Sequence, residues 1–168
     1  MDCTCKKHAE TEFQHLGPLC RACFTAVLQR RVRKALKDAG WLKRGQKVCF
    51  ADEKTAQGRA AITLFKAVIK GLPLEYAGDQ AEIMLSAQTA DDEAEGFLHQ
   101  LFAGKLEQNK AVNLLANITT QEIEKYCELE HIDGEQARKS ELRTRLDALD
   151  KRYPGTMFSL QKGKESFK

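Results

Sequence analysis

Residues 47–70 read KVCFADEKTAQGRAAITLFKAVIK, a short apolar run followed by a longer amphipathic segment. The run 47–51 is bounded by polar residues, which is typical of a buried strand. Apolar side chains then recur at helical spacing from about Thr55 to Lys70, and this predicts a helix with one face turned inward. A strand that leads directly into a helix is the repeating unit of α/β proteins. We therefore predict an α/β domain built on a parallel sheet.

The same alternation continues on both sides of this stretch. Residues 81–87 (AEIMLSA) predict a second strand, and residues 91–103 predict a helix that ends at Gly104. Residues 22–38, before the first strand, predict a helix with an apolar and a basic side. Only these two strands are evident, and a two-stranded parallel sheet buries little apolar surface. We therefore expect a partner, or the C-terminal helices, to complete the sheet.

The C-terminal third of the chain is predicted to be mainly helical. Thr119 lies three residues before Glu122, the spacing of a capping box, so a helix is predicted to begin there. Residues 134–152 predict the last long helix. Residues 157–160 (MFSL) predict a final strand or extended segment, and residues 162–168 predict a frayed tail.

Composition excludes several classes of protein. The chain has 168 residues, enough for one domain with its own core and a small additional module. No apolar run approaches the roughly 20 residues of a membrane span, and the first residues, MDCTCKKH, contain no apolar signal core. We therefore expect a cytoplasmic protein with no membrane partner. In that compartment six cysteines are more consistent with metal binding than with disulfides.

Charge is distributed unevenly along the chain. Residues 1–50 hold eleven Lys/Arg against four Asp/Glu, a net charge of +7, so that residues 51–168 carry −4. Residues 71–104 contain seven acids and no Lys or Arg. A basic front and an acidic middle indicate two different working surfaces, and the basic one is suited to nucleic acid. The alternative is that the basic residues form a solvated helix face.

A metal site is indicated near the N-terminus by the pattern C-x2-H-x11-C-x2-C. Two close pairs of ligands, each spanning one tight turn, can converge on a single tetrahedral ion. Thiolate and imidazole are ligands that zinc prefers, and four protein ligands leave no open position for a catalytic water, so we predict structural zinc. Cys3 could replace Cys5, His15 could replace His8, and a flexible tail without metal is the remaining alternative. The predicted ligands are Cys5, His8, Cys20 and Cys23.

The order of these parts resembles a known family, the tRNA 2-thiolation proteins. These are PP-loop ATP-pyrophosphatase-type enzymes, and they include the cytoplasmic tRNA 2-thiolation proteins and the archaeal and bacterial tRNA 2-thiouridine synthetases. The resemblance implies a truncated Rossmann-like (PP-loop/HUP-type) parallel sheet with flanking helices. It also implies a zinc knuckle over residues 1–24, an α/β domain over 25–160 and a flexible tail over 161–168. The likeness is carried by residues 19–24 (LCRACF), 47–51 (KVCFA), 87–95 (AQTADDEAE) and 138–160.

The chain departs from the family at the loop that binds ATP. In active relatives the first strand runs into S-G-G-x-D-S, whose bare backbone N–H groups cradle phosphates. This chain has EKTAQG over residues 53–58. Asp52 and Glu53 place negative charge beside the expected polyphosphate, and like charges at about 4 Å cost on the order of a few kcal/mol. We therefore do not expect tight ATP binding.

The sulfur chemistry of the family also lacks its residues here. Active relatives bring cysteines to the site to carry sulfur or hold an iron–sulfur cluster, one between the first helix and the D-D-x-A motif and one before the last helix. The corresponding stretches, residues 71–80 and 128–134, contain no cysteine. Cys127 and Cys49 are interpreted as small buried apolar residues, with a sulfur role for Cys127 as the alternative.

The D-D-E-A-E stretch survives without the histidine of the family. Gln88 stands in its place, and an amide does not transfer protons near neutral pH. Asp91 and Asp92 are expected to cap and charge the N-terminus of a helix, where acids are favoured by the helix macrodipole. The alternative is a remnant nucleotide or metal contact formed by these two acids and Lys54.

Taken with the resemblance, these losses predict a protein without catalytic residues of its own. The first hypothesis is a non-catalytic tRNA 2-thiolation protein that acts as partner subunit or tRNA-binding platform for a catalytic paralogue. The second is a self-associating zinc-containing scaffold without RNA contact, and the third is an active tRNA sulfurtransferase with a rewired ATP site. Under the first hypothesis the residues expected to contact tRNA phosphates are Arg21, Arg30, Arg31, Arg33, Lys34, Lys37, Lys43 and Arg44.

Overall fold

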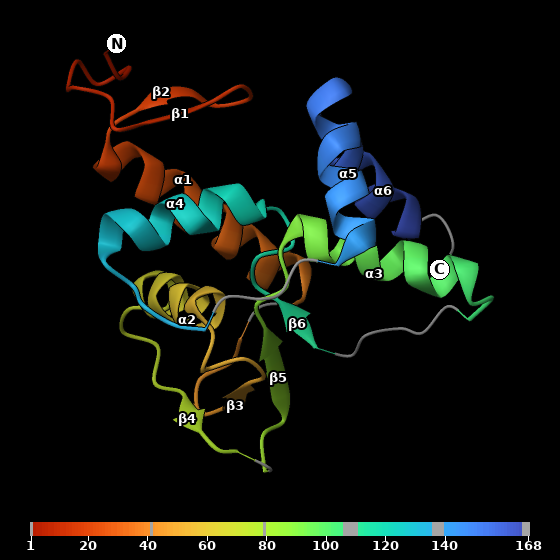
Figure 1. The fold of residues 1–168 in the computed structure, drawn as a ribbon. Coiled ribbons are helices and arrows are strands. Elements are labelled where there is room, and N and C mark those ends of the chain that lie inside the picture. Colours follow the sequence, from red (N-terminus) through yellow and green to blue (C-terminus); the bar gives the residue numbers. More distant parts are fainter. Residues whose placement is uncertain (1, 41, 79, 106–110, 136–139, 166–168) are drawn as a thin grey trace.

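The computed structural model describes residues 2–40, 42–78, 80–105, 111–135 and 140–165. Figure 1 shows a small β-hairpin near the N-terminus, a sheet with helices α1, α2 and α4 beside it, and a second group made of α3, α5 and α6. None of the helices in the described ranges combines the length and the apolar character needed to span a membrane.

The sheet confirms the predicted α/β class, and in the described ranges it has four strands. The two predicted strands form its centre as β3 (Lys47–Phe50) and β5 (Ile83–Ser86), which pair in parallel. Two short strands flank them, β4 (Glu75–Tyr76) and β6 (Val112–Asn113), giving the order β4-β3-β5-β6 with every pair parallel. Two strands of the chain itself therefore extend the pair predicted from sequence, and the C-terminal helices α5 and α6 do not complete the sheet; that a partner adds to it stays a prediction. A two-residue strand is too short to give a sequence pattern.

The main core lies between this sheet and three helices. These are α1 (Arg21–Asp38), α2 (Ala56–Val68) and α4 (Thr120–Glu130), close to the predicted bounds. The capping box predicted at the start of α4 is present, because the Thr119 hydroxyl and the Glu122 carboxylate exchange bonds with each other's backbone. Buried apolar side chains from the three helices and the strands form one cluster with Ile118, which lies just before α4; its members include Phe24, Leu28, Val32, Val48, Leu64, Phe65, Leu85 and Ile123.

The second group of helices forms a smaller cluster. α3 (Ala90–Phe102), α5 (Glu141–Arg152) and α6 (Thr156–Glu165) pack around Ala94, Leu146 and Met157. α3 follows β5 after a short connection, and α5 and α6 also contact the rest of the molecule, since Arg143 bonds Thr120 and the Phe158 ring lies 6.3 Å from that of His15.

Two predictions for this region are wrong. The last long helix begins at Glu141, not at residue 134, because Ser140 caps it and residues 134–135 run along α2 instead; residues 136–139 lie outside the described part. The predicted strand 157–160 is the first part of helix α6, since Met157 and Leu160 pack on one side at helical spacing. α6 also includes residues 162–165 of the predicted frayed tail, whose last residues, 166–168, are not described.

The N-terminal hairpin packs against the first turn of α1. β1 (Thr11–Phe13) pairs antiparallel with β2 (Gly17–Leu19), and Cys20 then leads directly into α1. The Phe13 and Phe24 rings are stacked with centroids 5.5 Å apart, which joins hairpin to helix.

Candidate functional site

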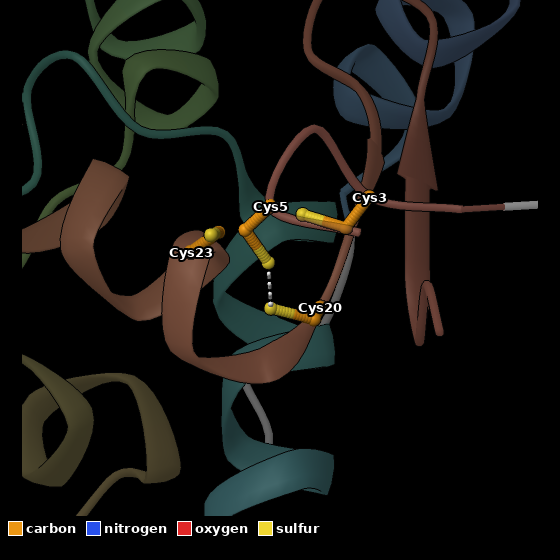
Figure 2. A group of neighbouring side chains, drawn as sticks. All are labelled: Cys3, Cys5, Cys20 and Cys23. Carbon is orange, nitrogen blue, oxygen red and sulfur yellow. Dashed lines mark hydrogen bonds between the residues drawn. The ribbon is translucent and has the colours of Figure 1, made fainter. Parts of the chain in front are cut away.

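Four cysteines from two short stretches converge beside the start of α1. Their sulfur atoms all lie within 4.8 Å of one another, and the Cys5 and Cys20 sulfurs are 3.5 Å apart. Figure 2 shows the side chains meeting from the N-terminal turn and from the first turn of the helix. In a tetrahedral site with metal–sulfur bonds of about 2.3 Å the sulfurs are about 3.8 Å apart, so the cluster has the dimensions for one ion. Its members are Cys3, Cys5, Cys20 and Cys23.

The fourth cysteine corrects the predicted ligand set, because Cys3 stands in the cluster and His8 does not. The chain reverses at Lys6, whose φ of 66° is left-handed. The Lys6 N–H donates to the Cys3 carbonyl at 2.8 Å, and the Cys3 N–H donates to the Lys7 carbonyl at 2.9 Å. This turn brings Cys3 back beside Cys5 and places His8 beyond the cluster. There the exposed residue His8 forms an antiparallel backbone β-bridge with Asp2.

The thiols of the cluster influence one another's ionisation. Backbone N–H groups of Cys5 and Cys20 lower the pKa of the Cys3 thiol to about 6. Hydrogen bonds with the other three sulfurs raise the pKa of the Cys23 thiol to about 12. Four thiolates at this spacing repel one another strongly, and a cation at their centre removes that repulsion. The arrangement is therefore suited to holding a metal ion.

His15, the other alternative ligand, has a different role. Its Nε2 lies 3.1 Å from Oε1 of Glu122, whose side chain is fully buried. The same carboxylate accepts bonds from the Arg31 guanidinium at 2.8 and 2.9 Å. Glu122 thus links the turn between β1 and β2 to α1 and α4, and His15 stands away from the cysteines.

The acids Asp91 and Asp92 lie at the start of α3. Asp92 accepts the Thr89 N–H at 2.8 Å in a capping box, which confirms its predicted capping role. Asp91 is buried, and its carboxylate accepts the Thr120 N–H at 2.5 Å. Burial raises the pKa of Asp91, while that backbone bond and the charge of Arg143 act in the opposite direction.

Arg143 is the residue that sequence reasoning missed. It is 5% exposed, and its guanidinium lies 3.0 Å from Asp91, 3.1 Å from Asp92 and 2.9 Å from Asp147. It also donates to the Thr120 hydroxyl at 2.6 Å. Its place one turn before Leu146, on the buried side of α5, was the available signal. Burial disfavours the charged form, yet the carboxylates together raise the pKa of Arg143.

The predicted grouping of Lys54 with Asp91 and Asp92 is not what the structure shows. Arg143 supplies the cation for both acids, and within the described residues no ion pair joins Lys54 to either. Lys54 is exposed, and its carbonyl accepts the Glu135 N–H at 3.4 Å.

The start of α2 stands where the family's phosphate-binding loop is expected, and a segment of this chain covers it. The Ala56 N–H donates to the Glu135 carbonyl at 3.2 Å, and Thr55 forms a parallel bridge with Glu135. The approach depends on Gly134, since a Cβ there would lie 2.3 Å from the Ala56 nitrogen. Gln57, next along the helix, donates to the Ala87 carbonyl at 2.5 Å and to Asp92 at 2.7 Å.

A cleft of about 760 Å³ opens beside this segment. Its walls come from the start of α2, from α3, α4 and α5, and from residues 131–135. Cys127 lines the cleft, and burial raises the pKa of its thiol, so it is a poor nucleophile. Cys49 lies in β3, away from the residues that line the cleft. Six carboxylates line the cleft, those of Asp92, Glu95, Glu124, Glu128, Asp133 and Glu135.

The predicted RNA-contacting residues fall into two sets. Three form ion pairs: Arg21 with Glu130 at 2.8 Å, Arg31 with Glu122 and Lys34 with Asp38 at 3.0 Å. The Glu130 pair raises the pKa of Arg21. The others are exposed, and none of them enters an ion pair within the described residues; they are Arg30, Arg33, Lys37, Lys43 and Arg44.

Comparison with known proteins finds likeness among solved structures. No protein-family model matches the sequence, and no curated protein matches it either. Among solved structures the chain is similar to the U34-tRNA thiolase NcsA from Methanococcus maripaludis with its 4Fe-4S cluster. The TM-score is 0.82 at 16% identity, and the match covers 99% of this chain and 87% of that one. The chain therefore has an NcsA-like fold, in line with the resemblance that its sequence motifs carry.

Proposed function

We propose that this chain is a non-catalytic member of the tRNA 2-thiolation proteins. It supports thiolation of the wobble uridine as a tRNA-binding platform, in the cytoplasm, together with a catalytic paralogue or a second copy of itself. The observation that carries the proposal is the covered start of α2. There the Glu135 carbonyl accepts the Ala56 N–H, so this N–H is not available to bind a phosphate.

The electrostatics of the cleft support the absence of ATP chemistry. A polyphosphate entering it would face Glu124, Asp133 and Glu135 at close range. Arg143, the one arginine among the described residues of the cleft wall, is already engaged by acids of the chain itself. Like charges in such a partly screened site cost on the order of a few kcal/mol at about 4 Å.

The platform role rests on the exposed side of α1. Arg30, Arg33 and Lys37 follow one another at intervals of three and four residues, so they lie along one side of the helix. Lys43 and Arg44 extend the basic surface beyond its end. A row of cations of this kind suits successive phosphates of an RNA strand, and it gives affinity that falls as salt rises.

A tRNA titration at two salt concentrations tests the platform. The triple variant R30Q/R33Q/K37Q is expected to lose affinity and to reduce the slope of log K against log salt by about 1 for each lost phosphate contact. The matched control, R145Q/K151Q/R152Q, removes the same charge from α5 and should keep both. A salt-independent affinity, or an equal loss in the control, would overturn the platform.

ATP provides the second arm of the test. Addition of ATP and Mg²⁺ is expected to leave the melting temperature of the chain unchanged, because a ligand that does not bind the folded state does not stabilise it. Thiolated tRNA should form only when a catalytic paralogue is added. An ATP-dependent thermal shift, or thiolation by this chain alone, would replace the proposal with an active enzyme.

We also infer that the ion of the four-cysteine cluster is structural zinc. The close spacing of the sulfurs supports a single ion, and four thiolates are a ligand set that zinc prefers. All ligand positions are then filled by protein, so the ion holds the N-terminal module together and takes no part in catalysis.

A further inference from the structure

We propose that the cleft binds an aliphatic chain that carries ammonium groups, either a free polyamine or the side chain of a lysine. This inference goes beyond the proposed function, since it concerns a ligand whose charge is opposite to that of a phosphate, and binding of that ligand requires no RNA. It rests on the size of the cleft, on the balance of charge in its walls and on the apolar surface between them.

The size of the cleft is that of a small-molecule site. Its volume of about 760 Å³ falls within the range of about 300–1,000 Å³ that is typical of ligand pockets. The walls come from four helices and from residues 131–135. The Glu135 backbone is held by hydrogen bonds to Ala56 and Lys54, so this wall is tied to the start of α2.

The charge balance selects a cation. Arg143 offsets Asp92 and lies 4.0 Å from Glu95 among the acids of the walls. However, Asp91 and Asp147 also contact its guanidinium, at 3.0 and 2.9 Å, so its charge is already used at that end of the cleft. Glu128 has Lys125 as its partner at 2.8 Å. Three further carboxylates, of Glu124, Asp133 and Glu135, line the cleft from α4 and from the covering segment. Within the described residues they have no ion-pair partner, so their field is not cancelled locally.

The apolar surface of the cleft favours an elongated cation with methylene groups. Ile123 is buried and Ile132 is half-buried, and both line the same cleft together with Ala56. Methylene groups gain by contact with such surface, whereas a hydrated metal ion does not. Aliphatic chains with charged ends bind in this manner, with the stem on apolar surface and the head at carboxylates. A linear polyamine or a lysine side chain has both parts.

Calorimetric titration of the full-length protein tests the proposal. The probes are the triamine spermidine, a lysine-containing peptide and a series of linear diamines, each at matched ionic strength, with Mg²⁺ as a compact dication. We expect saturable binding of spermidine or of the peptide, and affinity that rises with the length of the diamine. Binding of spermidine alone identifies the source as a free polyamine, and binding of the peptide alone identifies it as a partner's lysine.

A charge-neutral variant and a matched control locate the binding. E124Q/E135Q changes two exposed cleft residues and is expected to weaken binding by about tenfold, or about 1.4 kcal/mol. The control E75Q/E82Q removes two exposed acids that lie where β4 and β5 begin and that do not line the cleft. The affinity of this variant should equal that of the unaltered protein. Circular dichroism melts check that both variants fold.

Several results would overturn the proposal. These are the absence of saturable binding for every amine, Mg²⁺ binding as tightly as spermidine, and an equal loss in both variants. None of these results bears on the tRNA titration, so the two proposals fail separately.

Discussion

At the scale of single residues, Arg143 is a buried cation that forms ion pairs with several carboxylates. Its buried guanidinium contacts carboxylates from α3 and from its own helix, and it reaches the Thr120 hydroxyl at the start of α4. Buried charges of this kind are costly to separate, because each partner that remains is left without compensation. Arg143 therefore fixes the position of α5 relative to α3 and α4.

Replacement of Arg143 by methionine is expected to destabilise the protein by about 3–5 kcal/mol at pH 7. The loss should shrink as the pH falls, because burial already raises the pKa of Asp91 and protonation removes the repulsion that Arg143 no longer offsets. Urea unfolding at pH 7 and pH 5 measures both effects. In the matched control R145M an exposed pair with Glu141 is lost, at about 0–1 kcal/mol. Similar losses in R143M and R145M would contradict this account.

At the scale of elements, the start of α2 and residues 133–135 behave as one unit. Thr55 accepts the Gly58 N–H and caps the helix, and the Arg59 guanidinium donates to the Asp133 carbonyl at 2.8 Å. Gly134 lies so close to Ala56 that a side chain would meet backbone atoms, which cannot rotate away. The absence of a side chain at one position thus allows a whole segment to cover the helix.

Gly134→Ala is expected to cost about 1–3 kcal/mol, since the new methyl group must displace backbone from a packed contact. The amide of Ala56 should exchange with solvent faster, because its bond to the Glu135 carbonyl is lost. Hydrogen exchange and thermal unfolding measure these changes. Gly78→Ala is the control, as a Cβ at Gly78 meets nothing within 4 Å. Unchanged exchange at Ala56 would show that the segment is held by other contacts.

The elements predicted correctly from the sequence are those whose pattern lies within a few neighbouring residues. The run 47–51 and the Thr119–Glu122 pair carry their information within a few residues, and both were predicted correctly. Residues 157–160 fit a strand and a helix equally well, and packing on α3 decides for the helix. Cys3 was predicted only as an alternative to Cys5, because the chain reversal at Lys6 brings both into the cluster, and Arg143 was given no role, because its partners lie on distant helices.

At the scale of the whole molecule, the four-cysteine cluster is continuous with the main core. Cys3 and Cys20 are buried in the same apolar cluster as Leu19 and Phe24. Metal binding and folding of the N-terminal module are therefore linked, since the thiolates converge only in the folded chain. The sheet and α2 also contact each other and α4, so we expect them to stay folded without the ion.

Removal of the ion with a chelator is expected to release the N-terminal hairpin and to lower the melting temperature, while amides of β3 and β5 remain protected. Elemental analysis should find one zinc per chain and no visible absorbance from iron–sulfur. C3S should lose the metal, whereas H8A should retain it, because Cys3 stands in the cluster and His8 does not. Metal loss in H8A with retention in C3S would restore the ligand set first expected from sequence.

The exchange of His8 for Cys3 changes the electrical character of the loaded cluster. A divalent ion with three thiolates and an imidazole has one excess negative charge, whereas four thiolates leave two. Cys20 is the residue that precedes α1, where it makes no side-chain capping bond, and the first turn of α1 contains no acid. The positive end of the α1 macrodipole therefore meets two kinds of anion, the sulfurs of the cluster and the Glu10 carboxylate, which accepts the Arg21 N–H at 3.1 Å. The four cysteines with a bound metal would thus add an inorganic counter-charge at the start of α1, the longest helix in the described part of the chain.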